Sequence, residues 1–175
     1  MPQSHSRDTK TTPPKVLFFS SSDSGGAGIG ARRLHLSLRD HGLGNLMYVG
    51  KKQSDAQGVY IPPVPGQKIV ELPGGGMALE NYLLLERSWL GTVHRQYPNH
   101  SKNLEYFTIP GQSVQLDAVP LFADADVISM HWISGFLDPV LSAAQLAGKK
   151  LTWTVRDQNP FTGGCHYTGD SLLSG

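Results

Sequence analysis

A glycine-rich stretch directly after a short apolar run constrains the fold of this chain more than any other feature of its sequence. Residues 16–20 form an apolar run of the kind that is buried in parallel sheets. Residues 21–34 (SSDSGGAGIGARRL) then hold four glycines within six residues. Glycines between a strand and a helix let the backbone approach an anionic group, or let it pack closely on the helix itself. The two stretches therefore predict a strand, a glycine loop and a helix.

The residues after these glycines predict the helix and a second strand. Apolar side chains recur there at helical spacing and form one face, whereas His35 and three arginines lie off that face. Gly42 is placed to end the helix. The members of the apolar face are Ala27, Ala31, Leu34 and Leu38. Residues 45–50 follow as a strand, which a right-handed crossover would set parallel to the first.

The rest of the chain alternates between strands and helices after an irregular middle. Residues 51–76 contain IPPVPG and LPGGG and predict a surface excursion with little regular structure. The predicted helices are residues 77–93 and 138–150, and the predicted strands are residues 104–109, 126–132 and 151–157. This alternation predicts an α/β fold with a mainly parallel sheet.

Composition restricts the class of protein. A chain of 175 residues, 39% of them hydrophobic, suits one domain with a core, and a formal net charge of +1 gives no basic surface for nucleic acid. A single cysteine excludes an intrachain disulfide and fits a reducing compartment. Residues 1–14 are polar and predict a disordered tail rather than a signal peptide, and no apolar stretch approaches the roughly 18 residues of a membrane span. We expect a cytoplasmic protein, and a peripheral contact with the inner face of the membrane stays open.

Three predicted loops share one edge of the expected sheet. Ligands of such sheets bind outside the carboxyl ends of the strands, which is where residues 21–30, 131–135 and 156–164 would lie. These loops hold most of the chain's chemically interesting residues. We therefore expect one site that the three loops build together.

The residues of the glycine loop leave two interpretations open. Residues 26–31 satisfy the G-x-G-x-x-G/A pattern of dinucleotide-binding loops, and a helix N-terminus favours negative charge. The strand is expected to end near Ser20, which makes the loop longer than the usual tight turn. The second strand leads into Lys51 and Lys52 instead of an acidic residue, so an NADP 2′-phosphate is the dinucleotide alternative. The structural alternative is a turn in which Asp23 or Ser24 caps the helix.

The other two loops offer weaker chemistry when each is taken alone. His131 beside Trp132 is either a site residue or a packing residue, and the charges of Arg156 and Asp157 suit a site or a structural ion pair. Backbone N–H groups of residues 162–164 could face a ligand or simply make a turn. Cys165 and His166 are too few ligands to predict a zinc site. The sequence contains neither the spacing of a hydrolase triad nor a P-loop.

Three stretches of the sequence are informative when they are taken together: KVLFFSSSDSGGAGIGARRLHLSLRDHGLGNLMYVGKK, FADADVISMHWISGFL and GKKLTWTVRDQNPFTGGCHYTGD. Together they resemble the N-terminal half of family-four glycosyltransferases, most closely the bacterial members that build surface polysaccharides. The resemblance covers residues 15–52 and 104–170 in the order that the family requires. The linked segments SSDSGGA, ADVISMHWI and NPFTGGCHY are more diagnostic than the glycine loop.

The resemblance implies the GT-B fold, in which two Rossmann-like domains face each other across a cleft. Residues 15–175 would be the acceptor-side domain, and a second domain would grip the nucleotide sugar. The family moves a sugar from this donor to a growing glycan or a lipid-linked acceptor, with retention of configuration and without a metal or a separate cofactor. By resemblance, the donor-phosphate loop is Gly25, Gly26, Ala27 and Gly28; the acceptor side is His131, Trp132, Phe161, Gly163 and Gly164; the catalytic pair is Arg156 and Asp157.

The chain departs from the family pattern at three points. Arg156 stands where relatives carry the histidine that contacts the donor sugar, and Ser171 stands where they often carry a cysteine. The sequence ends at Gly175, before any donor-binding domain. We therefore expect a fragment or one subunit of a split enzyme, with a donor domain as its partner and no sugar transfer by this chain alone. The alternatives are a non-catalytic interaction module and an NADP-binding protein.

Overall fold

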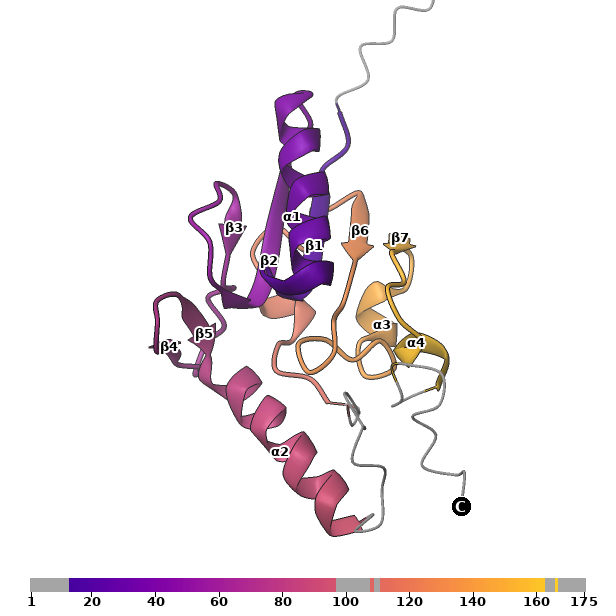
Figure 1. Cartoon of the computed structure of the whole chain (residues 1–175). Helices are drawn as coiled ribbons and strands as arrows, with labels where there is room; N and C mark the ends of the chain where they lie inside the picture. The colour runs from indigo at the N-terminus through magenta and orange to yellow at the C-terminus, as the bar shows by residue number, and fades with distance from the viewer. Residues whose placement is uncertain (1–12, 97–107, 109–110, 163–165, 167–175) are drawn as a thin grey trace, which may run out of the picture.

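One mixed and mostly parallel sheet organises the described part of the chain (Figure 1). The computed structural model describes residues 13–96, 108, 111–162 and 166. The elements are β1 (Val16–Ser22), α1 (Gly25–Asp40), β2 (Asn45–Lys52), β3 (Val59–Tyr60), β4 (Ile69–Glu71), β5 (Met77–Leu79), α2 (Glu80–Gln96), a 3-10 turn η1 (Leu116–Ala118), β6 (Val127–Met130), α3 (Ala143–Leu146), β7 (Lys150–Trp153) and α4 (Asn159–Thr162). None of the helices in these ranges is long and apolar enough to cross a membrane.

The order of the strands places β1 at the centre of the sheet. Within the described residues the sheet has seven strands in the order β4-β5-β2-β1-β6-β7, and β3 pairs with β2 beside this path. β1 is parallel to both β2 and β6, and β6 is parallel to β7. The antiparallel hairpin of β4 and β5 joins the end of β2. The expected α/β class with a mainly parallel, Rossmann-like sheet is confirmed.

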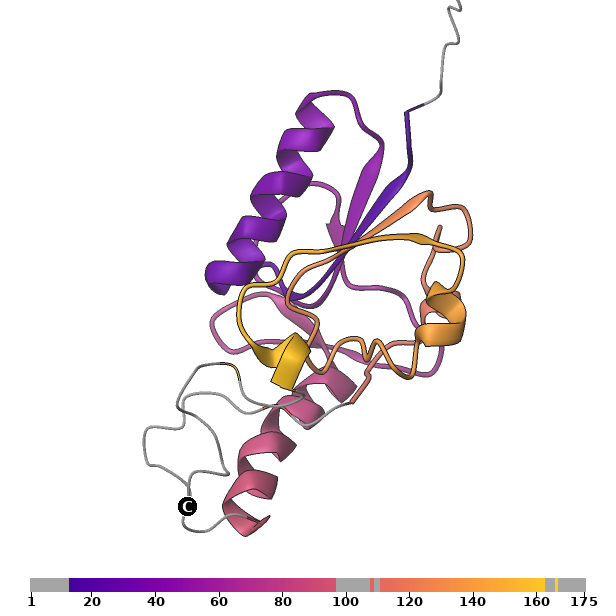
Figure 2. The ribbon, with the colours of Figure 1, turned by 90° about the vertical axis from the view of Figure 1, so that its right-hand side faces the viewer.

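Apolar residues cover both faces of the sheet, because successive side chains of a strand point to opposite sides. One cluster lies on the side of α1 and includes Phe18, Ala31 and Met47. The larger cluster lies on the other side and includes Phe19 and Phe136. Figure 2 shows α1 along one side of the sheet and α3 on the opposite side. The two-sided core explains why the apolar run of β1 is continuous rather than alternating.

The connection between β1 and α1 is shorter than the sequence predicts. β1 continues to Ser22 and α1 begins at Gly25, so two residues connect them and the glycines lie inside the helix. The strand continues through the serines because their hydroxyls have hydrogen-bond partners. Ser20 Oγ donates to the carbonyl of Ser22 (2.9 Å), and Ser21 Oγ donates to the carbonyl of Ser134 (2.7 Å). The expectation that the strand ends near Ser20 and leads into a long loop is wrong.

Neither expected cap forms at the start of α1. Asp23 is fully buried, and its carboxylate accepts hydrogen bonds from the backbone N–H groups of Gln53 (2.7 Å) and Ser54 (3.0 Å) and from the Ser54 hydroxyl. Ser24 occupies the N-cap position without a side-chain cap bond, and its hydroxyl donates to Gln53 Oε1. Both residues therefore link the end of β1 to the residues after β2, instead of closing the helix.

The buried face of α1 differs from the predicted one. His35 is fully buried, whereas Leu34 is 43% exposed. The His35 ring meets the edge of Phe18 at 5.8 Å, and its Nε2 bonds to the carbonyl of Gln57 (3.1 Å). Burial lowers the pKa of His35. The helix ends as expected, because Gly42 adopts a φ of 80° and donates to the carbonyl of Arg39.

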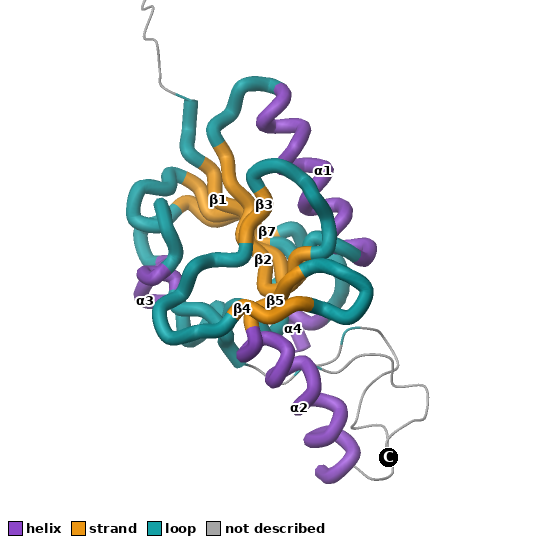
Figure 3. Tube along the Cα trace, turned by 90° about the vertical axis from the view of Figure 1, so that its left-hand side faces the viewer, coloured by secondary structure: helices purple, strands orange, loops and turns teal. Residues whose placement is uncertain are grey.

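The segment predicted to be irregular, residues 51–76, contains the two short strands β3 and β4, and β5 follows directly after it. β3 lies against β2, where Val59 is buried, and β4 and β5 form a hairpin around glycines 74–76, all of which have positive φ (Figure 3). These strands are short because prolines and glycines interrupt them. Pairing with β2 stabilises β3 and β5, and pairing with β5 stabilises β4. The predicted helix at residues 77–93 begins later, as α2 at Glu80, because residues 77–79 are used by β5.

Two further predictions need correction near β6 and β7. The predicted helix at residues 138–150 is reduced to α3, because Asp138 Oδ1 accepts the N–H groups of Val140 (2.9 Å) and Leu141 (3.1 Å) and holds a turn there. The predicted strands at residues 126–132 and 151–157 are shorter, as β6 and β7. The tail at residues 1–12 and the predicted strand at residues 104–109, apart from Thr108, lie outside the described residues.

Gly28→Ala tests the close packing of α1 on β1. A Cβ at position 28 would lie 2.5 Å from the Ser22 carbonyl oxygen and 2.8 Å from the Asp23 carbonyl carbon, and both are backbone atoms that cannot rotate away. We expect the free energy of unfolding in urea to fall by about 1–3 kcal/mol.

Gly26→Ala is the matched control, because no atom lies within 4 Å of a Cβ at that position. Alanine should raise the free energy of unfolding by about 0.5 kcal/mol there, through its higher helix propensity. Equal effects of the two substitutions would contradict the packing role of Gly28.

Candidate functional site

The loops after β1, β6 and β7 meet at one edge of the sheet. Ser21 bonds twice to the loop after β6: its N–H donates to the carbonyl of Trp132 (2.6 Å) and its hydroxyl to that of Ser134 (2.7 Å). The indole of Trp153, at the end of β7, donates to the carbonyl of His131 (3.0 Å). Because these strands are parallel, their carboxyl ends lie side by side. The chain therefore brings together the three loops that the sequence singled out.

Arg156 extends from the end of β7 to the first turns of α1. Its guanidinium occupies the space that a Cβ at Gly30 would need, so the two segments are in contact. The first turn of α1 carries no acidic residue and no side-chain cap, and Gly25 and Gly26 are exposed there. An open helix N-terminus beside a guanidinium is an environment that favours an anion.

The remaining members of the expected donor-phosphate loop are less accessible. Gly28 is buried against the backbone of Ser22 and Asp23, and Ala27 is half-buried. Gly28 thus serves helix–strand packing, whereas Gly25 and Gly26 stay open to a ligand.

His131 is buried on the α1 side of the sheet. Its ring stacks on Phe18 with a centroid separation of 5.7 Å and an interplanar angle of 17°. Its Nδ1 has no hydrogen-bond partner among the described residues. Burial, and secondarily the positive charge of Arg156, lower the pKa of His131 to about 4. The imidazole is therefore neutral at pH 7, and it packs under α1 rather than lining the large pocket described below.

Asp157 pairs with a histidine instead of with Arg156. Its Oδ2 lies 2.6 Å from His166 Nδ1, and its Oδ1 accepts the backbone N–H of Asn159 (3.0 Å). Among the described residues Asp157 has no ion pair with Arg156. Phe161, expected on the acceptor side, is 80% exposed, and Gly163 and Gly164 lie outside the described residues.

A chain of hydrogen bonds connects Trp132 to Asp157. The indole Nε1 of Trp132 donates to Ser134 Oγ (2.9 Å), which donates to Asn159 Oδ1 (3.3 Å). Asn159 Nδ2 donates to Thr108 Oγ1 (2.8 Å), and this hydroxyl lies 3.0 Å from His166 Nε2. His166 is almost fully buried and bonds to Asp157 at its other nitrogen. We call this set the Trp132–Asp157 chain.

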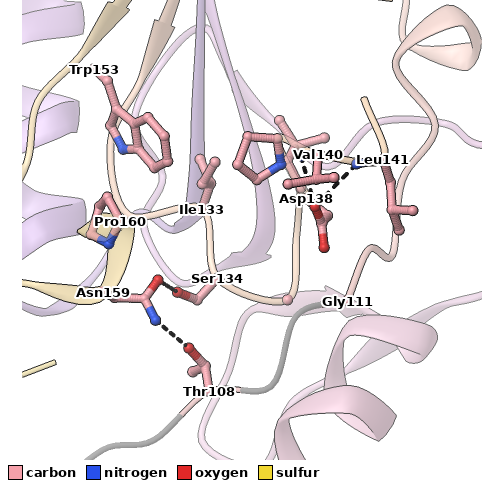
Figure 4. Close-up of a pocket in the computed structure, with 13 residues that line it drawn as sticks. Thr108, Gly111, Ile133, Ser134, Asp138, Val140, Leu141, Trp153, Asn159 and Pro160 are labelled. Carbon is pink, nitrogen blue, oxygen red and sulfur yellow. Dashed lines mark hydrogen bonds between the residues drawn. The ribbon is translucent and has the colours of Figure 1, made fainter. Parts of the chain in front are cut away.

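A pocket lies directly against the Trp132–Asp157 chain. It has a volume of about 580 Å³, within the range of ligand sites. Figure 4 shows Trp153, Pro160 and Ile133 on one side, Val140 and Leu141 on the other, and Thr108, Asn159 and Ser134 along its lower wall. A narrow hollow lined by Arg156 and Asp157 shares Ser134, Trp153 and Asn159 with the pocket. The pocket and the Arg156 region are thus neighbours that share a wall.

The same region shows what the sequence did not reveal. Thr108, Ser134 and Trp153 line the pocket, yet none was expected to be a site residue. Asn159 and His166 belong to the segment NPFTGGCHY, where the resemblance already signalled importance without giving them roles. Thr108 had no signal, because its segment was predicted as a strand. Among the described residues no group of three or more His, Cys, Asp or Glu could hold a metal ion.

No match to this chain was found among protein-family models, curated proteins or solved structures. The family likeness therefore rests on the sequence motifs alone, and the fold and the geometry above stand independently of it.

The lowered pKa of His131 predicts that acid destabilises the fold. Between pH 6.5 and about pH 4 the unfolded chain binds a proton at this residue that the folded chain excludes, so the free energy of unfolding falls as the pH falls. The loss attributable to His131 should approach about 3 kcal/mol at pH 4. Urea unfolding of His131→Phe over this pH range should show a free energy of unfolding that falls less steeply with pH. The part of this pH dependence that is due to His35 should be retained.

His41→Phe is the control for this measurement. His41 is exposed at the end of α1, where its Nδ1 bonds to the carbonyl of Ser37 (2.7 Å). The substitution replaces the same residue type outside the core, so it measures what the loss of an exposed imidazole alone does to the pH dependence. An unchanged slope in His131→Phe would contradict the buried, neutral state of His131.

Proposed function

We propose that this chain is the acceptor-side domain of a retaining glycosyltransferase. It holds a glycan or lipid-linked acceptor at the carboxyl edge of its sheet and presents α1 to the diphosphate of a nucleotide-sugar donor. The observation that carries this proposal is the convergence of the loops after β1, β6 and β7 on one edge, next to a pocket of about 580 Å³. Under this proposal the protein acts in the cytoplasm or at the inner face of the membrane, together with a donor-binding domain.

The diphosphate side of the site rests on α1 and Arg156. In sugar transfer the leaving diphosphate gains negative charge, and fixed positive dipoles and cations stabilise such charge. The open N–H groups at Gly25 and Gly26 supply the dipoles, and the Arg156 guanidinium near Gly30 supplies the cation. Arg156 thus takes a phosphate-binding role where related sequences carry a histidine.

The acceptor side rests on the mixed chemistry of the pocket. A sugar presents apolar C–H faces and polar hydroxyl edges. Trp153, Pro160 and Ile133 offer the apolar wall, and Thr108, Ser134 and Asn159 offer hydrogen-bonding groups. Asp157 does not need to contact the substrate for this purpose, because it holds His166 and, through it, the wall of the pocket.

A specific observation also favours the interaction module as a second candidate function. Val140, Leu141 and Phe161 are 81%, 68% and 80% exposed, and the first two line the pocket. Large exposed apolar side chains mark surfaces that a partner covers. In a two-domain glycosyltransferase this surface would face the donor domain, so both functions predict a partner and differ in whether sugars bind.

The dinucleotide alternative gains one feature and loses another. The two-residue connection between β1 and α1 is as tight as dinucleotide-binding loops require. Lys51, however, lies 3.9 Å from the Glu86 carboxylate, so its charge is already partly compensated before any 2′-phosphate binds. NADPH therefore belongs in the experiment as a competing ligand.

A nuclear magnetic resonance titration of the ¹⁵N-labelled chain tests the proposal. Inorganic pyrophosphate should shift the amides of Gly25 and Gly26, and methyl glycosides should shift the Trp153 indole signal, without competition between them. Arg156→Gln should weaken pyrophosphate about tenfold, because one charge-assisted contact is lost.

Arg33→Gln is the control, because Arg33 is an exposed arginine of the same helix. Equal weakening by both substitutions would indicate unspecific charge attraction and would contradict the Arg156 site. NADPH binding far tighter than pyrophosphate would favour the dinucleotide alternative, and glycosides that bind nowhere would favour the interaction module.

A further inference from the structure

The Trp132–Asp157 chain has a fixed direction because of its two ends. An indole N–H can only donate a hydrogen bond, and a carboxylate can only accept. His166 must therefore donate through Nδ1 to Asp157. We take the ring as neutral in the inference below, so that its Nε2 accepts. Thr108 then donates its only hydrogen to His166, so Asn159 approaches Thr108 with its NH₂ group.

The same reasoning fixes the other half of the chain. Asn159 turns its oxygen towards Ser134 because its nitrogen faces Thr108. Ser134 donates its only hydrogen to that oxygen and accepts from Trp132. Every hydrogen bond thus points from Trp132 towards Asp157. Bonds aligned in this way polarise one another and strengthen the arrangement.

The two hydroxyls that line the pocket are left as acceptors. Each hydroxyl oxygen has one hydrogen and two lone pairs. Thr108 and Ser134 have each used the hydrogen and one lone pair within the chain, so one lone pair of each stays available to a ligand. Both residues line the pocket, and so does the carboxylate of Asp138, which also can only accept. The pocket wall therefore offers acceptors where a ligand needs partners.

We propose that Thr108 and Ser134 form a hydroxyl subsite that selects its ligand by hydrogen-bond direction. Sugar hydroxyls, which donate, bind there. Groups that can only accept, such as fluoro, methyl ether or phosphate groups, are rejected. The inference rests on the proposed function, in which the pocket holds the acceptor sugar, and it adds which chemical groups are recognised. Asp157 and His166 are positioning residues, because they act on the ligand only through Thr108.

The protonation of His166 tests the direction of the hydrogen bonds in the Trp132–Asp157 chain without any ligand. In the full chain labelled with ¹⁵N-histidine, the nitrogen shifts at pH 7 should show a neutral ring with its proton on Nδ1. Asp157→Asn should move the proton towards Nε2, because the new amide can donate to Nδ1. Asp124→Asn is the control, because it changes an exposed carboxylate outside the Trp132–Asp157 chain. An Nε2–H tautomer or a doubly protonated ring in the unmodified chain would overturn the proposal.

The ligand preference is tested with methyl glycosides of glucose, galactose and mannose and their monodeoxyfluoro analogues. For a glycoside that shifts the Trp153 indole signal, fluorine at one position should weaken binding about fivefold or more, because a donor is lost. Thr108→Val should remove that preference, and Thr108→Ser should retain it. Thr152→Val, on an exposed threonine of β7, should leave it unchanged.

The outcomes separate this inference from the function on which it rests. Glycosides that bind with no preference between hydroxyl and fluorine would overturn the hydroxyl subsite and leave the acceptor site standing. Glycosides that shift no signal of the pocket would overturn the acceptor site and the subsite with it. If Thr108→Val does not fold, Ser134→Ala and the tautomer of His166 decide the question.

Discussion

The contact between Gly28 of α1 and the backbone of Ser22 and Asp23 determines where the helix begins relative to the sheet. A side chain at position 28 would push α1 away from β1, and the open first turn would move with it. Asp23 fixes the same junction from the other side, because its buried carboxylate binds the backbone after β2. The N-terminus of α1 is thus held at the carboxyl edge of the sheet by packing and by hydrogen bonds at once.

The loops after β6 and β7 depend on that junction. Ser21, at the end of β1, bonds to the main chain of Trp132 and Ser134, so the position of β1 determines where the β6 loop runs. From Ser134 the Trp132–Asp157 chain continues to Asn159 and Thr108. One network therefore connects the start of α1, where an anion would bind, to the pocket wall, where a sugar would bind.

The sequence predicted which loops meet at one edge of the sheet more successfully than it predicted how their side chains are placed. The rule that ligands bind at the carboxyl ends of parallel strands placed three loops at one edge, and they meet there. His131 and Trp132 lie on opposite faces of the sheet, because adjacent side chains of a strand point to opposite sides. The rule could not predict that His131 would pack under α1 and that Trp132 would join the Trp132–Asp157 chain behind the pocket. It also could not predict Thr108, which has no motif and is held at the pocket by its hydrogen bonds with Asn159 and His166.

What the sequence by itself determined is the class of fold: the apolar runs, their spacing and the glycines sufficed to predict a parallel α/β sheet, because those signals act over a few neighbouring residues. Tertiary structure alone decided the extension of β1 through its serines, the burial of His35 instead of Leu34, and the pairing of Asp157 with His166. In each of these cases a polar group is buried beside a partner distant in sequence, and its hydrogen bonds compensate the loss of water. Local propensity contains no information about that partner.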